Sequence, residues 1–358
     1  MKIVLSGGGT LGPVVPLLAI AGAYQKVNPD AQFVWVGTKD GPEKELVEKM
    51  QIPFYTITAG KFRRYLSFWN IVDFFRILAA FVQSVVFLYH EKPDLLISAG
   101  GFVSVPLHWA GWLMRIPSWV HQQDIRPGLA NKLMARGANQ ITTAIQDSVN
   151  FFDKNKTEWI GNPTRNLKVA DIQASKKRFG IEDDEPVIFA LGGGTGSAHI
   201  NKMVLEALSV WPDSWHVIHL VGRERSSKLP EYAAGLFKNY QVYKFFTEEM
   251  KDAYAVADIV IARAGFGTIT ELASLSKAAV LLPISDSHQE DNVKYLVDRD
   301  AAVILEEVAD TGLKLAQVAK DLMADSEQRK KLGQKLREVL PPATEEDMVR
   351  MVDRLAMY

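Results

Sequence analysis

The sequence predicts an α/β protein of two doubly wound domains, and three observations lead to this prediction. The chain has 358 residues, which is more than one ordinary hydrophobic core accommodates. A glycine run occurs twice, near Gly7 and near Gly192, each time after an apolar segment and before a helical pattern. Short apolar segments alternate with amphipathic helical patterns in both halves, as in parallel sheets that helices cover on both faces.

Five segments of the N-terminal half are expected to be strands, with room between them for crossover helices: residues 2–5, 31–37, 94–100, 118–123 and 140–145. Five more strands are expected in the C-terminal half: residues 186–190, 215–222, 240–246, 257–265 and 278–285. Their short, nearly continuous apolar runs are typical of strands that are buried on both faces.

The boundary between the domains is expected near the Gly-Asn-Pro sequence at 161–163, which ends the first series of strands. Beyond the two prolines at 341–342, the chain shows a capping pattern and helical periodicity, and we expect this last helix to pack on the first domain. The predicted domains are residues 1–163 with 341–358, and residues 164–340.

Charge and composition narrow the class of partner. The net charge is -1, but 17 Lys and Arg face 12 Asp and Glu up to Arg165, against 24 and 30 in the remainder. The N-terminal half therefore suits an anionic partner better, although such an imbalance alone decides nothing. The chain has no cysteine, which excludes disulfides and thiolate chemistry. Basic and aromatic residues do not interleave as in nucleic-acid-binding proteins, so no nucleic acid is expected.

The first glycine run matches G-x-G-x-x-G at Gly7, Gly9 and Gly12, a pattern typical of dinucleotide-binding turns. That pattern also needs an acidic residue at the end of the second strand to bind ribose, and the second strand here ends in Gly37 without one. NAD is therefore disfavoured. Either run can still offer backbone N–H groups to a phosphate or a sugar hydroxyl, and a purely structural tight turn is the alternative.

The segment IVIARAGFGTITELASL combines several features of a diphosphate site. A buried strand is expected to end at Ala262, Gly265 opens the turn, and Thr268 begins a helix whose free N–H groups suit a diphosphate. The Glu271 carboxylate would accept hydrogen bonds from two ribose hydroxyls, or would only stabilise the helix N-terminus. The next strand is followed, at the same edge of the sheet, by His288, Gln289 and Asn292.

Two apparent metal motifs do not predict a metal site. The sequence Asp-Arg-Asp at 298–300 imitates a metal-binding D-x-D motif, but it falls in a connection from helix to strand. His216 and His219 are three residues apart in an expected strand, so they point to opposite faces and cannot bind one ion together.

Seven motifs occur in the order, and near the spacing, that one family shows: GGTLGPVVP, SAGGFVSVP, HQQDIRPGLANKLMAR, GNPTR, LGGGTGSA, ARAGFGTITEL and PISDSHQEDN. Over nearly its whole length the chain resembles the MurG-type enzymes of glycosyltransferase family 28, which add N-acetylglucosamine to lipid-linked muramoyl-pentapeptide in peptidoglycan synthesis. The resemblance implies the GT-B fold, in which two Rossmann-like domains face a cleft and the C-terminal helix returns to the first domain. Each glycine run would then line one wall of that cleft.

The resemblance also implies a site for UDP-N-acetylglucosamine in the C-terminal domain, with no metal or other cofactor. Within this site Glu271 would bind the ribose and Gln289 the sugar hydroxyls. The residues implied are Arg165, Gly192, Gly193, Gly194, Thr195, Gly265, Thr268, Glu271 and Gln289.

The N-terminal domain would bind a lipid-linked diphosphate acceptor, by the same resemblance, through Gly8, Gly9, Thr10, Gly12, Gly101, Ser104 and Asn131. The family's turn usually reads G-G-T-G-G-H, whereas Leu11 and Pro13 stand here in place of a glycine and the histidine. The family's HEQN segment is HQQD here, so that Gln122 and Asp124 replace a carboxylate and an amide.

The catalytic base has to be sought elsewhere, because Pro13 has neither a basic side chain nor a backbone N–H. We expect Asp124 to be the general base, since it follows a buried strand and carries a carboxylate where the family has an amide. His121 is a second candidate. Alternatively, Asp124 only caps the turn before Pro127.

A membrane-facing segment is expected in residues 61–90. The run from Ile77 to Tyr89 carries no charge, but it is shorter than the ~20 residues of a spanning helix. Basic and aromatic residues precede or flank it: Lys61, Arg63, Arg64, Arg76, Phe68, Trp69, Phe74 and Phe75. We expect peripheral docking on an anionic membrane at its cytoplasmic face, while a buried crossover helix is the alternative and both can hold.

The resulting hypothesis is an inverting glycosyltransferase that moves N-acetylglucosamine from UDP to a polyprenyl-diphosphate-linked muramoyl-pentapeptide. Helix N-termini would stabilise the UDP leaving group, while a base deprotonates the attacking hydroxyl. Two alternatives stay open. One is a glycolipid synthase with a diacylglycerol acceptor, and the other is a non-catalytic UDP-sugar sensor, which the absence of the family histidine keeps open.

Overall fold

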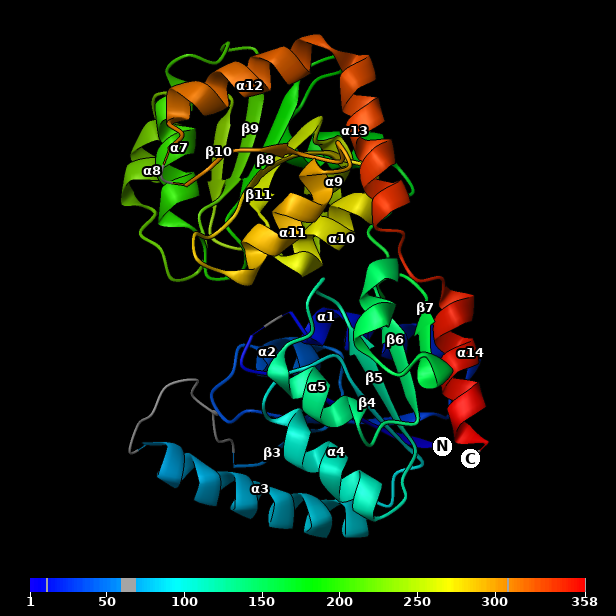
Figure 1. Ribbon diagram of the computed structural model, residues 1–358. Coiled ribbons are helices and arrows are strands. Elements are labelled where there is room, and N and C mark those ends of the chain that lie inside the picture. Colours follow the sequence, from blue (N-terminus) through cyan, green and yellow to red (C-terminus); the bar gives the residue numbers. More distant parts are fainter. Residues whose placement is uncertain (11, 59–68, 308, 358) are drawn as a thin grey trace. The chain divides into compact units, whose positions relative to one another are not determined.

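The computed structural model describes residues 1–10, 12–58, 69–307 and 309–357. It divides into two compact units (Figure 1): unit 1 is Met1–Arg165 with Pro342–Tyr358, and unit 2 is Asn166–Pro341. The expected boundaries lie one or two residues from these. The reason is a link between the two crossing segments, in which Asn162 pairs with Pro342 and its carbonyl accepts from the Ala343 N–H at 2.9 Å.

Unit 1 contains a seven-stranded parallel sheet in the order β3-β2-β1-β4-β5-β6-β7. Its strands are β1 (Lys2–Ser6), β2 (Gln32–Gly37), β3 (Phe54–Thr56), β4 (Leu95–Ser98), β5 (Ser118–Gln122), β6 (Gln140–Thr143) and β7 (Thr157–Trp159). Its α-helices are α1 (Val14–Val27), α2 (Glu43–Lys49), α3 (Trp69–Glu91), α4 (Ser104–Leu113), α5 (Leu129–Ala135) and α14 (Glu345–Ala356), and two 3₁₀ turns span Gln146–Phe151 and Lys154–Lys156.

Alternating side chains of the central strand β1 build the two core layers of unit 1. Ile3 and Leu5 pack in one cluster with residues of α1 and α14, whereas Val4 packs in another with residues of α3 and α4. All three side chains are fully buried. A strand buried on both faces needs apolar residues at every position, which is why KIVL reads as a continuous apolar run.

Unit 2 contains a six-stranded parallel sheet in the order β10-β9-β8-β11-β12-β13. Its strands are β8 (Val187–Leu191), β9 (His216–Leu220), β10 (Tyr240–Tyr243), β11 (Ile259–Arg263), β12 (Ala278–Leu282) and β13 (Val303–Ile304). Its helices are α6 (Ile172–Phe179), α7 (Ala198–Leu208), α8 (Lys228–Ala234), α9 (Glu249–Val256), α10 (Phe266–Ser274), α11 (His288–Val297), α12 (Gly312–Ala324) and α13 (Ser326–Val339).

The prediction of two parallel, doubly wound α/β domains is confirmed, and each of the ten expected strands is present. Three strands were not predicted: β3, β7 and β13. Each is only two or three residues long and lies at an edge of its sheet. Segments of this length are too short to show a hydrophobic period.

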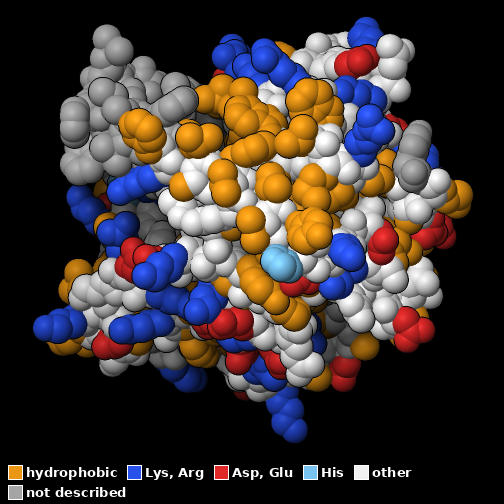
Figure 2. Space-filling model, turned by 90° about the horizontal axis from the view of Figure 1, so that it is seen from below, with side chains coloured by type: hydrophobic (Ala, Val, Ile, Leu, Met, Phe, Trp, Pro, Cys, Tyr) orange, Lys and Arg blue, Asp and Glu red, His pale blue; other side chains and the backbone are white. Residues whose placement is uncertain are grey.

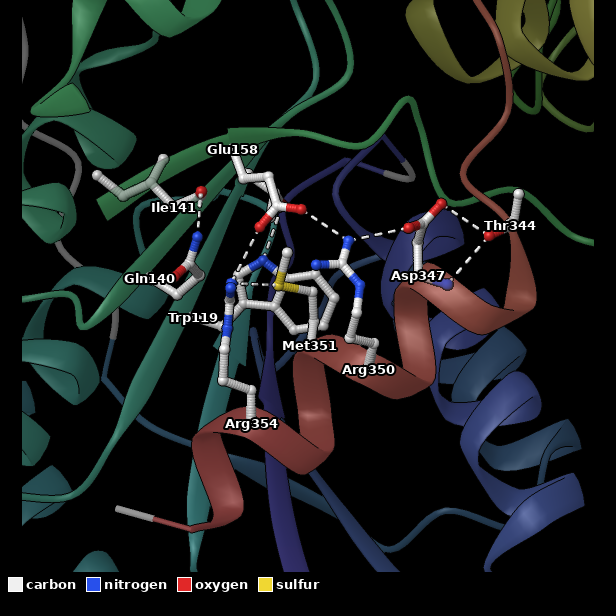
Figure 3. A network of polar contacts seen from close by, with 10 residues as sticks. Trp119, Gln140, Ile141, Glu158, Thr344, Asp347, Arg350, Met351 and Arg354 are labelled. Atoms are coloured by element: carbon white, nitrogen blue, oxygen red, sulfur yellow. Dashed lines mark hydrogen bonds and ion pairs between the residues drawn. The ribbon is translucent and has the colours of Figure 1, made fainter. Parts of the chain in front are cut away.

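The C-terminal helix α14 returns to unit 1, as expected, and is held there by apolar and charged contacts. Met351 and Val352 are fully buried in the cluster that contains Leu5. On the polar side, shown in Figure 3, the Glu158 carboxylate of β7 accepts from Arg350 Nη2 at 2.6 Å and from Arg354 Nη2 at 3.1 Å. The helix therefore completes the core of a domain that begins more than 300 residues earlier in the chain.

Shortening one buried side chain of α14 tests this role. Met351→Ala is expected to lower the free energy of unfolding of unit 1 by about 2 to 5 kcal/mol, because it leaves a cavity in the core. Hydrogen exchange measured at increasing urea concentrations should show that unit 1 loses stability and that unit 2 does not. Met357→Ala is the matched control, since Met357 is 85% exposed. Equal stability of the two variants would contradict this role for α14.

Candidate functional site

Glycine-rich turns lie at the point in each sheet where the strand order reverses. In unit 1 this point lies between β1 and β4, which are followed by Gly7–Gly12 and by Gly100 and Gly101. In unit 2 it lies between β8 and β11, which are followed by Gly192–Gly196 and by Gly265. Open parallel α/β sheets bind their ligands at the carboxyl ends of strands at such points. Each unit therefore carries a candidate binding site of its own.

The turn after β8 is packed against the connection that follows β9. Gly196 has a φ of +85°, and a Cβ there would collide with the Val221 carbonyl. The Gly194 carbonyl accepts from the Arg223 N–H at 3.4 Å. Ser197 then caps α7 by accepting from the Ile200 N–H at 3.2 Å. The expected segment from Gly192 to Thr195 thus lies in a compact turn at a capped helix start.

The turn after β11 brings two of the expected residues together. Helix α10 begins at Phe266, two residues before the expected Thr268, and Gly265 is its N-cap. A Cβ on Gly265 would lie 4.0 Å from Nε2 of Gln289, whose own Oε1 accepts from the Ile284 N–H at 3.1 Å. The Gln289 amide therefore lies beside Gly265, at the N-terminus of α10.

Glu271 lies deeper than the sequence indicates. The helix was expected to begin at Thr268, with Glu271 one turn in, but α10 begins two residues earlier, and Glu271 lies in its second turn with 6% of its surface exposed. Its Oε2 accepts from the Tyr254 hydroxyl of α9 at 3.1 Å. The Glu271 side chain is therefore buried, and its carboxylate is already oriented by a neighbouring helix.

Two charged residues that sequence reasoning missed fix the edge of the sheet next to Gln289. Arg263, at the end of β11, donates from Nη1 to the carbonyls of Leu282 and Pro283 at 3.3 and 3.2 Å. Its Nη2 donates to Glu307 Oε1 at 2.6 Å, and this contact holds the pKa of Glu307 below its usual range. A charged residue at the end of the buried run IVIAR was the available signal. Arg263 thereby fixes the end of β12, which leads into the segment that carries Gln289.

Arg165 belongs to unit 1 in the structure, where it is the last residue before unit 2. It was expected in the C-terminal domain, which was predicted to begin at residue 164. The link between Asn162 and the segment around Pro342 keeps the crossing chain with unit 1 up to this point.

In unit 1 the two glycine turns pack directly on each other. A Cβ on Gly101, whose φ is +96°, would lie 3.0 Å from both the nitrogen and the carbonyl oxygen of Gly8. A Cβ on Gly9 would lie 2.9 Å from the Phe102 ring. Thr10 and Gly12 remain exposed beyond this contact. The structure therefore joins the two expected acceptor loops into one surface.

The HQQD segment, which begins in the last two residues of β5, joins this surface through its glutamines. Gln123, which is 5% exposed, donates from Nε2 to the Gly12 carbonyl at 3.1 Å. Asn131 donates from Nδ2 to Gln122 Oε1 at 2.6 Å. Asp124 is the next residue along the chain and is partly exposed. Gln123, which was not predicted, therefore connects the segment to the first glycine turn, while Asn131 lies beside Gly100 and Asp124 follows Gln123 in the chain.

Two of the expected residues have structural roles instead. His121 is fully buried, with Nδ1 2.8 Å from Thr142 Oγ1 and Nε2 2.9 Å from Asn162 Oδ1. Burial lowers the pKa of His121 to about 4, so the ring is neutral and both of its nitrogens are engaged. Ser104 is also fully buried and donates to the Gly100 carbonyl at 3.1 Å. His121 is therefore excluded as the base, and Ser104 shapes its own loop.

The described residues hold no cluster of three His, Asp or Glu side chains suited to a metal ion. Asp300 of the D-x-D-like sequence instead accepts from Lys335 Nζ at 3.0 Å. The two histidines of β9 have different partners, since His216 pairs with Glu185 while His219 bonds to Asn201 and Tyr240.

Two parallel-sheet units, each with a glycine turn at its switch point, form the architecture of the GT-B fold, and family models identify the chain as a glycosyltransferase of this class. Residues 3–143 match the N-terminal domain and residues 187–343 the C-terminal domain of glycosyltransferase family 28. The chain belongs to the MurG family within this class.

Relatives support this membership over nearly the full length. The chain is 31% identical over 349 residues, 96% of both chains, to the UDP-N-acetylglucosamine--N-acetylmuramyl-(pentapeptide) pyrophosphoryl-undecaprenol N-acetylglucosamine transferase of Bacillus subtilis (strain 168). It is 32% identical to the enzyme of the same name from Legionella pneumophila (strain Paris), over 90% of this chain and 89% of the relative. The crystal structure of Acinetobacter baumannii MurG superposes with a TM-score of 0.74 at 26% identity, covering 99% of both chains.

Proposed function

We propose that this protein transfers N-acetylglucosamine from UDP-N-acetylglucosamine to undecaprenyl-diphosphate-linked muramoyl-pentapeptide. The observation that carries the proposal is its similarity to named transferases of this activity across 96% of the chain. The presence of a candidate site at the switch point of both sheets supports it further, because the reaction needs one site for each substrate.

Unit 2 binds the UDP-sugar in this proposal. The diphosphate lies at the turn after β8 and at the N-terminus of α10, where the first N–H groups of a helix and the helix dipole stabilise negative charge. The Glu271 carboxylate accepts from the ribose hydroxyls, and Gln289 binds the sugar. As the anomeric C–O bond breaks, the same N–H groups stabilise the charge that develops on UDP.

Unit 1 binds the acceptor, whose hydroxyl attacks the anomeric carbon from the face opposite UDP. Asp124 accepts the proton of that hydroxyl as the new glycosidic bond forms, and UDP leaves with the electron pair of the broken C–O bond. Because the attack comes from the opposite face, the product has inverted configuration. Pro13 cannot perform this step, and His121 is buried with both nitrogens engaged. Asp124 is the carboxylate next to the connection between HQQD and the glycine turn.

Radiolabel transfer tests the activity. The purified protein is incubated with UDP-[¹⁴C]N-acetylglucosamine and either lipid-linked muramoyl-pentapeptide or diacylglycerol, and the extracted lipid is counted. Label only in the first lipid supports the proposal. Label in diacylglycerol instead would identify a glycolipid synthase. UDP binding without transfer to either lipid would identify a sensor. Either outcome contradicts the proposal.

A membrane-facing surface on α3 brings the protein to its lipid substrate in this proposal. Five side chains on one face of this helix are each more than half exposed: Phe75, Leu78, Val82, Val86 and Tyr89. Figure 2 shows hydrophobic side chains gathered on this face of the molecule, with Lys and Arg around them. Trp112 and Leu113 at the end of α4, which packs on α3, are also exposed. Exposed apolar patches of this kind mark interaction sites.

These five exposed apolar side chains, from Phe75 to Tyr89, form a stripe that lies further along α3 than the sequence indicated. Lys61, Arg63, Arg64 and Phe68 fall outside the described residues, and Arg76 is the exposed cation beside Phe75. In the described part of the chain, no helix has the length and apolar character that crossing a bilayer requires. Docking by one helix face fits these observations.

Charge placed in the stripe should weaken docking. Leu78→Glu with Val82→Glu is expected to reduce flotation with anionic vesicles at least tenfold, because both apolar area and electrostatic attraction are lost. Leu236→Glu in unit 2 is the control, since Leu236 is equally apolar and 65% exposed. If the double variant floats like the control, α3 is not the membrane surface.

A further inference from the structure

The carboxylate of Glu43, the first residue of α2, is fully buried beside the first glycine turn of unit 1. Its Oε1 accepts from the Thr38 N–H at 2.8 Å and from the Thr38 hydroxyl at 2.5 Å. Its Oε2 accepts from the Gly9 N–H at 3.3 Å. Three donors therefore converge on one buried carboxylate, which is the arrangement that makes burial of this group tolerable.

The backbone leaves space for this carboxylate at separate glycines. A Cβ on Gly8 would lie 2.7 Å from the carboxyl carbon of Glu43 and closer still to Oε1. A Cβ on Gly41 would collide with both Glu43 and the Thr38 hydroxyl. A Cβ on Gly37 would collide first with the Phe54 ring, at 2.5 Å, and would lie 3.1 Å from Oε1. Gly8 and Gly41 thus leave the space that an acid of the protein itself occupies.

Glu43 lies between the turn after β1 and the end of β2. Dinucleotide-binding domains hold ribose and phosphate at the corresponding position. The absence of an acid at the tip of β2 was the sequence argument against NAD. The structure supplies an acid there from α2, but Glu43 points inward to the Gly9 N–H that would otherwise face a phosphate. The opposite side of the turn is covered by Gly101 and Phe102. Protein groups therefore occupy both sides of Gly8, and Glu43 also engages the N–H of Gly9, whose surface is otherwise exposed.

We propose that Glu43 is an internal anion that takes the phosphate position at Gly9, so that the first glycine turn binds no substrate phosphate there. Glu43 is a positioning residue: it fixes the turn whose exposed end, Thr10 and Gly12, adjoins Gln123 and the acceptor site. The diphosphate of the acceptor consequently uses donors other than the Gly9 N–H. The kinetic part of this inference rests on the proposed acceptor role of unit 1.

Chemical rescue tests the internal anion. In Glu43→Ala, kcat/KM for the lipid acceptor should fall about tenfold or more, because charge-assisted hydrogen bonds that hold the turn are lost. The affinity for UDP, measured by calorimetry, should stay within twofold. Acetate at millimolar concentration should restore a large part of the loss and raise the Tm of this variant, because it fits the vacated space and the same three donors. Glu48→Ala is the control, since Glu48 is exposed on the same helix.

Glu43→Gln provides a second variant that keeps the shape of the side chain. The single carbonyl oxygen of glutamine can accept from some of the three donors, but its NH₂ group is itself a donor and repels the others. We therefore expect this variant to have a lower kcat/KM for the acceptor, and acetate should not restore it. Inorganic diphosphate should compete with the acceptor more strongly in Glu43→Ala than in the parent, since the Gly9 N–H is then open.

Three results would overturn the inference: parent-like acceptor kinetics in either variant, an equal loss of UDP affinity, or no acetate effect on Glu43→Ala. If Glu43→Ala does not fold, parent-like acceptor kinetics of Glu43→Gln are by themselves enough to overturn the inference. The acetate-dependent Tm does not depend on catalysis. An absence of transfer in the parent therefore contradicts the proposed function, while the Tm measurement still decides the position of the anion.

Discussion

Replacing Asp124 by asparagine is expected to lower the rate of N-acetylglucosamine transfer about 100-fold or more. An amide cannot take the proton of the attacking hydroxyl, and the other groups considered for this role are excluded by their chemistry or burial. Pro13 has no basic side chain, and both nitrogens of His121 are engaged in a fully buried network. Single-turnover measurements with saturating substrates report this step directly.

Asp30→Asn is the matched control for this variant. Asp30 is exposed between α1 and β2, at the amino end of the sheet and away from the glycine turns. The control should transfer at the parental rate. The pH–rate profile adds a second readout, since loss of a general base removes the acidic limb of the profile. A rate of Asp124→Asn within a few fold of the parent would remove Asp124 from the mechanism and leave it as a residue of the turn before Pro127.

Glu271→Ala is expected to weaken UDP binding about 100-fold or more. Two hydrogen bonds from ribose hydroxyls to a carboxylate are lost, and each such bond contributes about 1.5 kcal/mol or more when it forms out of water. Calorimetric titration with UDP measures the change, and circular dichroism verifies that the variant is folded. Because Glu271 is 6% exposed, we also expect some loss of stability.

Tyr254→Phe separates the two roles of Glu271. It removes the hydroxyl that donates to Oε2 at 3.1 Å but leaves the carboxylate in place, so UDP affinity should fall only severalfold. Glu290→Ala, an exposed acid of α11, should leave the affinity unchanged. If folded Glu271→Ala binds UDP like the parent, the carboxylate belongs to the α9–α10 packing alone.

Much of the architecture follows from local sequence patterns. KIVL and PVIFA are continuously apolar because both faces of a central parallel strand are covered, and glycine must follow wherever the backbone turns tightly into a helix. These patterns are local, so the ten longer strands and the glycine turns could be located without a structure. The edge strands could not, since two or three residues carry no period.

Local sequence patterns predicted the two α/β domains, the family, and which loops gather at the carboxyl ends of the strands. Which polar groups in those loops are already engaged depends on contacts between distant segments, and these patterns did not predict it. His121 and Ser104 face inward, Gln123 bonds to Gly12 from 111 residues away, and Glu43 bonds to Gly9 across 34 residues. A hydrogen bond depends on the relative position of two segments to within fractions of an ångström. The crossover helices and the packing of the sheet set that position, and no local pattern encodes it.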